Sequence, residues 1–190
     1  MAMNLINTNR VFRSFAAMAM LAAVLPVSPA QAATQGSVGA TSTGTITINA
    51  TIAGLVQISN LTDLTFSALT GSADAQQTEN VCVWSNTSSK SYTIRATGSG
   101  TASAFTLASG TNAPVPYTVA WANSTAATTG TGLTTNVASA AFTSAAVTPL
   151  CAAGANPSAK LFVTILAADQ NTMIANAAYT GVLTLLVTPQ

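Results

Sequence analysis

Few residues in this 190-residue chain can do chemistry: there are 2 cysteines, 4 acidic residues and no histidine. Without histidine, the sequence excludes the Ser-His-Asp and Cys-His arrangements that activate a serine or cysteine nucleophile. Asp74 and Glu79 are the acids nearest to each other, and they lie in the polar stretch GSADAQQTEN, which is typical of a solvated turn. This turn lacks the pair of carboxylates across a cleft that a glycosidase needs, and it has too few charged oxygens for a calcium-binding loop. We predict no enzyme activity, no catalytic residue, no metal and no cofactor.

The first 32 residues have the three parts of a secretory signal peptide. Export matters for the cysteines, because the cellular compartment decides whether they are oxidised to a disulfide. A polar start carries Arg10 and Arg13, residues 14–27 are apolar, and small residues stand at Ala30 and Ala32. The apolar run would rise only about 21 Å as a helix, short of a hydrocarbon core of roughly 30 Å. We predict export with cleavage after Ala32.

Export to an oxidising compartment favours a disulfide between Cys82 and Cys151. The alternatives are two buried free thiols or a metal site, and no histidine is present to complete the metal site. In the chain-entropy model, closing a loop of this length stabilises the fold by about 4 kcal/mol. Cleavage also leaves only Lys90, Arg95 and Lys160 as basic side chains, too few to bind nucleic acid.

Apolar residues alternate with polar ones along the remaining chain, which is the period of a half-buried strand. Turn signals such as Gly98-Ser99-Gly100 separate the runs, and residues 167–178 are predicted to be a loop with at most one helical turn. This pattern predicts an all-β fold, an antiparallel β-sandwich. The alternating sets are Val56 and Ile58; Leu64 and Phe66; Tyr92, Ile94 and Ala96; Tyr117, Val119 and Trp121; Leu161, Val163 and Ile165; and Tyr179, Leu183, Leu185 and Val187.

The stretch GTITINATI at residues 44–52 is predicted to be a solitary strand, with Ile46, Ile48, Ala50 and Ile52 on one face. It can be the first strand of a closed sandwich, or it can pair with the sheet of a neighbouring molecule. The pattern alone leaves both open. We divide the chain into a signal peptide at 1–32, an amino-terminal extension with the candidate donor strand at 33–53, and a sandwich domain at 54–190.

Several segments resemble a known family of pilins. The opening GTITINATIAGLVQISNLTDLTF resembles the amino terminus of class 5 colonisation-factor pilins. The segments VCVWSN, YTIRATGSG, AFTLASG and VPYTVAW look like the spore coat U and secreted-pilin family of the archaic chaperone-usher branch. The ending AYTGVLTLLVTPQ is similar to the closing strand of both, so the resemblance covers most of residues 44–190.

The resemblance implies an incomplete immunoglobulin-like sandwich that is completed by the amino-terminal strand of the next subunit. A periplasmic chaperone and an outer-membrane usher would be partners, together with copies of the chain or sister pilins. The protein would be exported to a surface fimbria that supports adhesion or biofilm formation. Two sets of residues would meet where one subunit binds the next. The donor residues would be Ile46, Ile48, Ala50 and Ile52, and the groove residues would be Tyr179, Leu183, Leu185 and Val187.

A second function competes with this one: a secreted or surface-bound binding module, or adhesin, with a complete fold of its own. An exposed aromatic platform would favour it. The aromatic residues Trp84, Tyr92, Tyr117 and Trp121 lie instead in alternating runs, which predicts that they belong to the core.

Overall fold

The computed structural model describes residues 33–151 and 157–190, so the predicted leader and its cleavage site lie outside the described residues. The chain divides into two units, Met1–Thr51 and Ile52–Gln190. In the second unit the elements are β1 (Val56–Ser59), β2 (Ala75–Ser85), β3 (Ser91–Gly98), a 3-10 turn (Thr101–Ser103), β4 (Thr106–Leu107), β5 (Val115–Pro116), β6 (Thr118–Ala122), β7 (Thr131–Gly132), β8 (Phe142–Thr143), β9 (Ala159–Ile165), α1 (Ala167–Gln170) and β10 (Leu183–Pro189).

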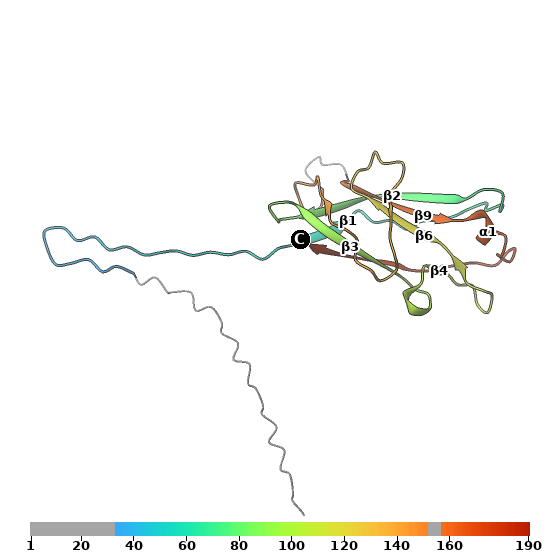
Figure 1. The fold of residues 1–190 in the computed structure, drawn as a ribbon, viewed down its shortest axis with the longest axis horizontal. Helices are drawn as coiled ribbons and strands as arrows, with labels where there is room; N and C mark the ends of the chain where they lie inside the picture. The colour runs from blue at the N-terminus through green and yellow to red at the C-terminus, as the bar shows by residue number, and fades with distance from the viewer. Residues whose placement is uncertain (1–32, 152–156) are drawn as a thin grey trace, which may run out of the picture. The chain divides into compact units, whose positions relative to one another are not determined.

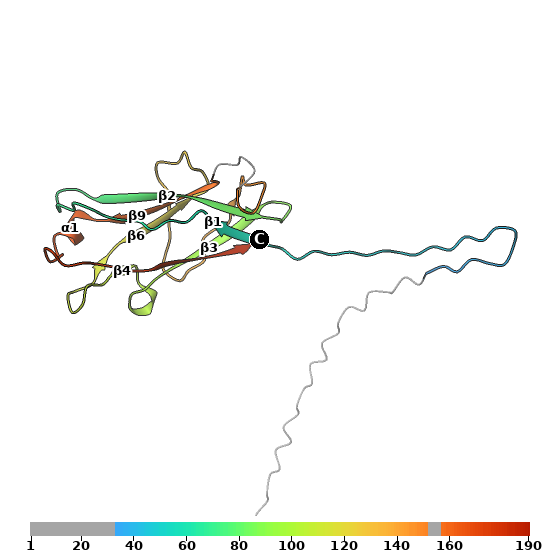
Figure 2. The ribbon, with the colours of Figure 1, turned by 180° about the vertical axis from the view of Figure 1, so that it is seen from behind.

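The strands of the second unit form a sandwich, and every pairing between them is antiparallel. One sheet has the order β1-β2-β9-β6-β7, the other has the order β10-β3-β8, and β4 pairs with β5 alone. Figures 1 and 2 show β2, β9 and β6 side by side in one layer, with β3 in the other. The predicted all-β, antiparallel sandwich is therefore confirmed.

The core between the layers follows the alternation in the sequence. In β3, Tyr92, Ile94 and Ala96 are fully buried, while Arg95 on the opposite face is exposed. Facing them from the other sheet are the buried side chains Val81, Val83, Val119, Trp121, Leu161, Val163 and Ile165. The Trp121 ring nitrogen donates a hydrogen bond of 3.1 Å to the Tyr92 hydroxyl, which satisfies both polar groups inside the core.

The strand order is that of an immunoglobulin sandwich with one position vacant. Such a sandwich has strands A, B, E and D in one sheet and C, F and G in the other. Here β1, β2, β9 and β6 take the places of A, B, E and D, while β3 and β10 take those of C and F. In the part of the chain that the structure describes, β10 is the edge of its sheet, and no strand stands in the G position beside it.

Two stretches with strand-like alternation form no strand in this single chain. Residues 46–55 have no assigned strand, and neither do residues 60–72 between β1 and β2. The second stretch is interrupted by positive φ angles at Asn60, Ala68 and Gly71, which an extended strand does not tolerate. The expectation of a loop with at most one helical turn at 167–178 is confirmed, because α1 has only four residues.

Candidate functional site

The vacant position beside β10 opens into a groove of about 1610 Å³ that runs between the two sheets. One wall consists of Tyr179, Leu183 and Leu185, which are among the four residues that the pilin resemblance assigns to an acceptor groove. The fourth, Val187, does not line the groove, although it packs against the core as the other three do. The groove therefore borders the first half of β10 and the segment that leads into it.

The backbone of β10 presents free hydrogen-bonding groups along this wall. Gln190 donates its N–H to the Ser91 carbonyl at 3.0 Å, which places Gln190 and Ser91 at a hydrogen-bonding pair position of the ladder. Such pairs alternate along an antiparallel ladder. With Leu183 opposite Gly98 and Leu185 opposite Ala96, the N–H and C=O groups of these leucines point away from β3. A further strand could pair with this edge without displacing an existing hydrogen bond.

The opposite wall is the irregular stretch between β1 and β2. Leu61, Leu64, Phe66 and Leu69 line it, and the last three also pack against the core. The alternation of Leu64 and Phe66 was visible in the sequence, but its link to the groove was not, because the wall has no strand pairing. Polar contacts fix this stretch to β2: Asn60 Nδ2 donates to the Asn80 carbonyl at 2.7 Å, and the Thr62 hydroxyl donates to Glu79 Oε2 at 2.8 Å.

The floor of the groove is apolar and well packed. It is formed by Leu161, Val163 and Ile165 of β9, together with Leu107 and Tyr117. The Tyr117 ring stacks on Phe105 with a centroid distance of 5.7 Å, and burial raises the pKa of its phenol above the ordinary value. A floor of this kind takes up apolar side chains and disfavours charged ones.

One end of the groove is held together by Gln170, a buried polar residue that the sequence analysis did not identify. Its Nε2 donates to the carbonyl oxygens of Ala73 at 2.8 Å and Ile165 at 3.0 Å, and its Oε1 accepts from Gly71 N at 3.1 Å. These bonds join the short helix α1 to the end of the 60–72 wall. No sequence signal marks this role, because the partners lie up to 99 positions away.

In the amino-terminal unit, the predicted donor residues are exposed. Ile46 is 81% and Ile48 is 89% exposed, and Ala50 is also exposed, as is Ile52 at the start of the second unit, at 82%. The only β-bridge within the described part of the first unit joins Thr34 and Thr45 through two hydrogen bonds of 3.0 Å. Each of these isoleucines exposes apolar surface to water, and burying that surface would be energetically favourable.

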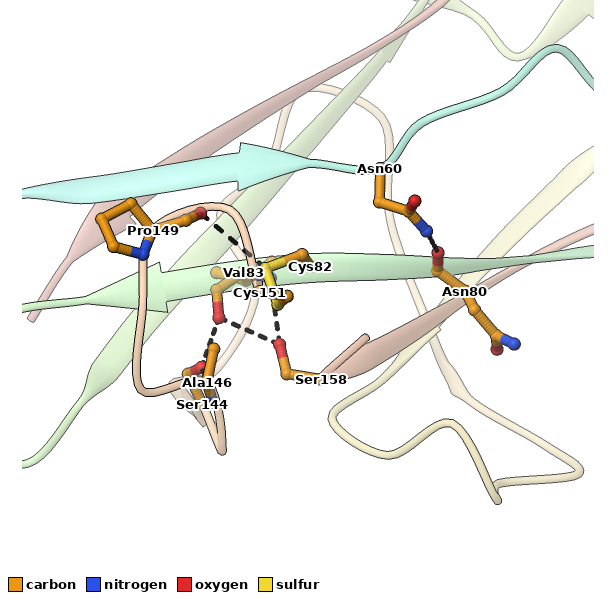
Figure 3. Close-up of a disulfide and its surroundings, with 9 residues drawn as sticks. All are labelled: Asn60, Asn80, Cys82, Val83, Ser144, Ala146, Pro149, Cys151 and Ser158. Carbon is orange, nitrogen blue, oxygen red and sulfur yellow. Dashed lines mark hydrogen bonds between the residues drawn. A yellow bond between two sulfur atoms is a disulfide. The ribbon is translucent and has the colours of Figure 1, made fainter. Parts of the chain in front are cut away.

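The structure contains a disulfide between Cys82 and Cys151, with the Cα atoms 6.0 Å apart (Figure 3). These residues pack with Ala146 and Trp84 in a small cluster separate from the main core. The Val83 carbonyl accepts hydrogen bonds from the Ser144 and Ser158 hydroxyls, and this fixes both ends of the 144–158 segment to β2 (Figure 3). None of these residues lines the groove.

Residues 33–151 and 157–190 contain no group of three or more Cys, Asp and Glu side chains arranged to hold a metal ion. Among the same residues, no helix is long and apolar enough to cross a membrane. Tyr92 and Trp121 are fully buried and Tyr117 is 7% exposed, so these three aromatic residues do not form a surface platform.

Comparison with known proteins gives a likeness of fold and shows no family for this chain. No family model matches the sequence, and no curated protein matches it. The fold is similar to that of a chain in a solved chaperone–tip adhesin complex of CFA/I fimbriae biogenesis, with a TM-score of 0.50 and 18% sequence identity. The match covers 71% of this chain and 41% of that chain, so the present chain spans less than half the length of its structural neighbour. The likeness is one of fold.

Proposed function

We propose that this protein is a structural subunit of a surface fimbria, assembled by donating its amino-terminal strand to the next copy. The observation that carries the proposal is the groove beside β10, which occupies the vacant G position of the sandwich and has an apolar floor. Its occupant would be residues 44–53 of a second copy. Their alternating Ile46, Ile48, Ala50 and Ile52 fit an apolar groove, while their backbone would pair with the edge of β10.

Donation between copies explains how exposed apolar residues and an open groove coexist in one exported chain. Soluble proteins cover long unpaired edges and large apolar patches. Because each copy would carry one groove and one donor strand at different places, the contact is head to tail and generates a filament rather than a closed pair. The similarity to a chain from fimbrial biogenesis supports this assignment.

Before assembly, the groove would need a temporary occupant. A periplasmic chaperone fits this role, followed by an outer-membrane usher, which matches the partners that the pilin resemblance implies. The assembled fibre would lie on the cell surface and support adhesion or biofilm formation. Amino-terminal sequencing of the exported protein is expected to begin at Ala33, and retention of the first residue would contradict cleavage.

The decisive experiment removes the donor and returns it as a peptide. A subunit lacking residues 33–53 is expected to form no detergent-resistant ladder on unboiled gels, whereas the full chain forms one that boiling disperses. Adding the peptide GTITINATIA is expected to raise the melting temperature of the shortened subunit, because a ligand that binds only the folded state stabilises it. The control peptide has the same residues in an order without alternation.

Two results would contradict donation by this strand. The first is a ladder formed by the shortened subunit as readily as by the full chain. The second is a shortened subunit that is a stable monomer without chaperone and does not respond to the peptide. The second result would mean that the sandwich is already complete, and it would favour the self-contained binding module.

A further inference from the structure

The point where the donor segment joins the sandwich is held by one side chain, that of Asn86. Asn86 N donates to the Leu55 carbonyl at 3.1 Å, which continues the β1–β2 ladder one pair beyond Val56 and Ser85. Asn86 Oδ1 accepts from Leu55 N at 2.6 Å, and Asn86 Nδ2 donates to the Ala53 carbonyl at 2.9 Å. The side-chain amide thus acts as an extra rung of the ladder and holds the backbone on both sides of Gly54.

The backbone at Gly54 makes no turn of the hairpin kind. Two-residue hairpin turns need a positive φ angle at a central residue. Gly71 and Gly110 have positive φ angles, but Gly54 and its neighbours do not. A Cβ on Gly54 would lie 3.6 Å from the Pro189 side chain, so this residue is packed against the end of β10. Residues 53–55 therefore lead into β1 without reversing direction.

The direction of entry decides which groove the donor segment can reach. The chain passes Pro189 at the end of β10, then runs through β1 and on along the groove wall at 61–71. To lie in its own groove, the segment at 46–52 would have to reverse within residues 53–55 and run back beside β1. That reversal would break the bonds that Asn86 makes to Ala53 and Leu55.

We infer that Asn86 is a positioning residue that prevents the donor strand from occupying its own groove and so reserves it for a second copy. This inference rests on the proposed function. The two hydrogen bonds of the side chain oppose the reversal, and their loss is expected to raise the self-occupied population about tenfold or more. A groove blocked by its own strand could accept no other, so Asn86 would favour filament growth.

The test compares wild type with Asn86→Ala and Asn86→Asp by hydrogen exchange. The full chain is refolded with its disulfide intact, monomer is separated from oligomer by size, and exchange of amides 44–52 is measured in each fraction. Strand pairing protects these amides, so a protected monomer reports self-occupation and a protected oligomer reports exchange between copies. Asn123→Ala is the matched control, because it removes another asparagine side-chain bond, from Nδ2 to the Thr143 carbonyl at 3.4 Å, between two residues that do not line the groove.

The expected result is an unprotected wild-type monomer, a protected wild-type oligomer, and a protected monomer fraction that rises about tenfold in Asn86→Ala. Asn86→Asp retains the acceptor for Leu55 but sets a carboxylate oxygen against the Ala53 carbonyl, where Asn86 has a donor, so its rise is expected to be at least as large. Equal monomer protection in wild type, Asn86→Ala and Asn86→Asp would overturn the inference and leave the proposed function standing. A protected wild-type monomer would overturn it too. Amides 44–52 that stay unprotected in every fraction would instead overturn the proposed function.

Discussion

Replacing Ile48 in the proposed donor segment gives the sharpest test of the proposed contact between subunits. Ile48 is 89% exposed in the free chain, so nearly its whole side chain is available for burial in a partner. Burying a full isoleucine contributes about 1.5 to 3 kcal/mol. Ile48→Ala removes three carbons, each worth about 0.8 kcal/mol, so this contact is expected to weaken by about 2 kcal/mol, or roughly thirtyfold.

Ile48→Asp is expected to have a larger effect than loss of burial alone. The groove floor consists of Leu161, Val163, Ile165 and other apolar side chains, with no basic residue among its lining. An aspartate placed there would be an unpaired charge in an apolar environment, at a cost of several kcal/mol. This variant is therefore expected to fold with its chaperone and form no fibre.

Thr47→Asp is the matched control for this experiment. It adds the same charge one residue away, on the opposite face of the strand, where the side chain would point out of the groove. Purified subunits are compared by the ladder on unboiled gels and by the rate of polymerisation. The reasoning is refuted if Ile48→Asp and Thr47→Asp polymerise equally well, because the alternation would then have no part in the contact between subunits.

Three further predictions concern the sandwich itself. Cys82→Ser with Cys151→Ser is expected to lower the free energy of unfolding by about 2 to 5 kcal/mol, measured by denaturant titration, and unchanged stability would contradict a structural disulfide. Tyr92→Phe leaves the buried Trp121 N–H without its partner and is expected to cost about 1 to 3 kcal/mol. Burial raises the pKa of the Tyr92 hydroxyl, so the folded state disfavours its ionised form. The contribution of Tyr92 to stability is therefore complete below about pH 10 and falls as the pH rises further. Wild type is expected to lose stability above about pH 10 more steeply than Tyr92→Phe. Gln170→Ala is expected to reduce stability by about 2 kcal/mol and to weaken binding of the donor peptide, and calorimetry that finds unchanged affinity would argue against a role at the groove.

Period-two alternation predicted the buried faces well, because burial on one side of a strand leaves a direct mark on residue type. Tyr92, Ile94 and Ala96 were assigned to one face and are fully buried. Leu64 and Phe66 also pack against the core, although the segment that carries them is not a strand. Alternation reports which side chains face inward, but it does not report whether the backbone has a partner to pair with.

The groove was only partly predictable for the same reason. Its β10 wall was expected from the pilin resemblance, which assigns Leu183 and Leu185 to it, but the opposite wall and the end at Gln170 depend on tertiary contacts. Asn86 forms a hydrogen bond with Leu55, 31 positions away, and Gln170 forms one with Gly71, 99 positions away. A single polar side chain with a distant partner leaves no periodic signal in the sequence.

The positions of the disulfide and the groove show how a sandwich with a vacant edge can remain folded. Cys82 lies on β2, between β1 and β9 in the five-stranded sheet, and the bond to Cys151 closes a loop of 69 positions. With Ser144 and Ser158 bonded to the neighbouring Val83 carbonyl, this region is fixed both covalently and by buried hydrogen bonds. The groove beside β10 has no disulfide among its described lining residues, and Gln170 fixes one end of it through hydrogen bonds. The disulfide and the hydrogen bonds around it lie apart from the groove, so in the proposed assembly a donor strand would enter beside β10 without disturbing them.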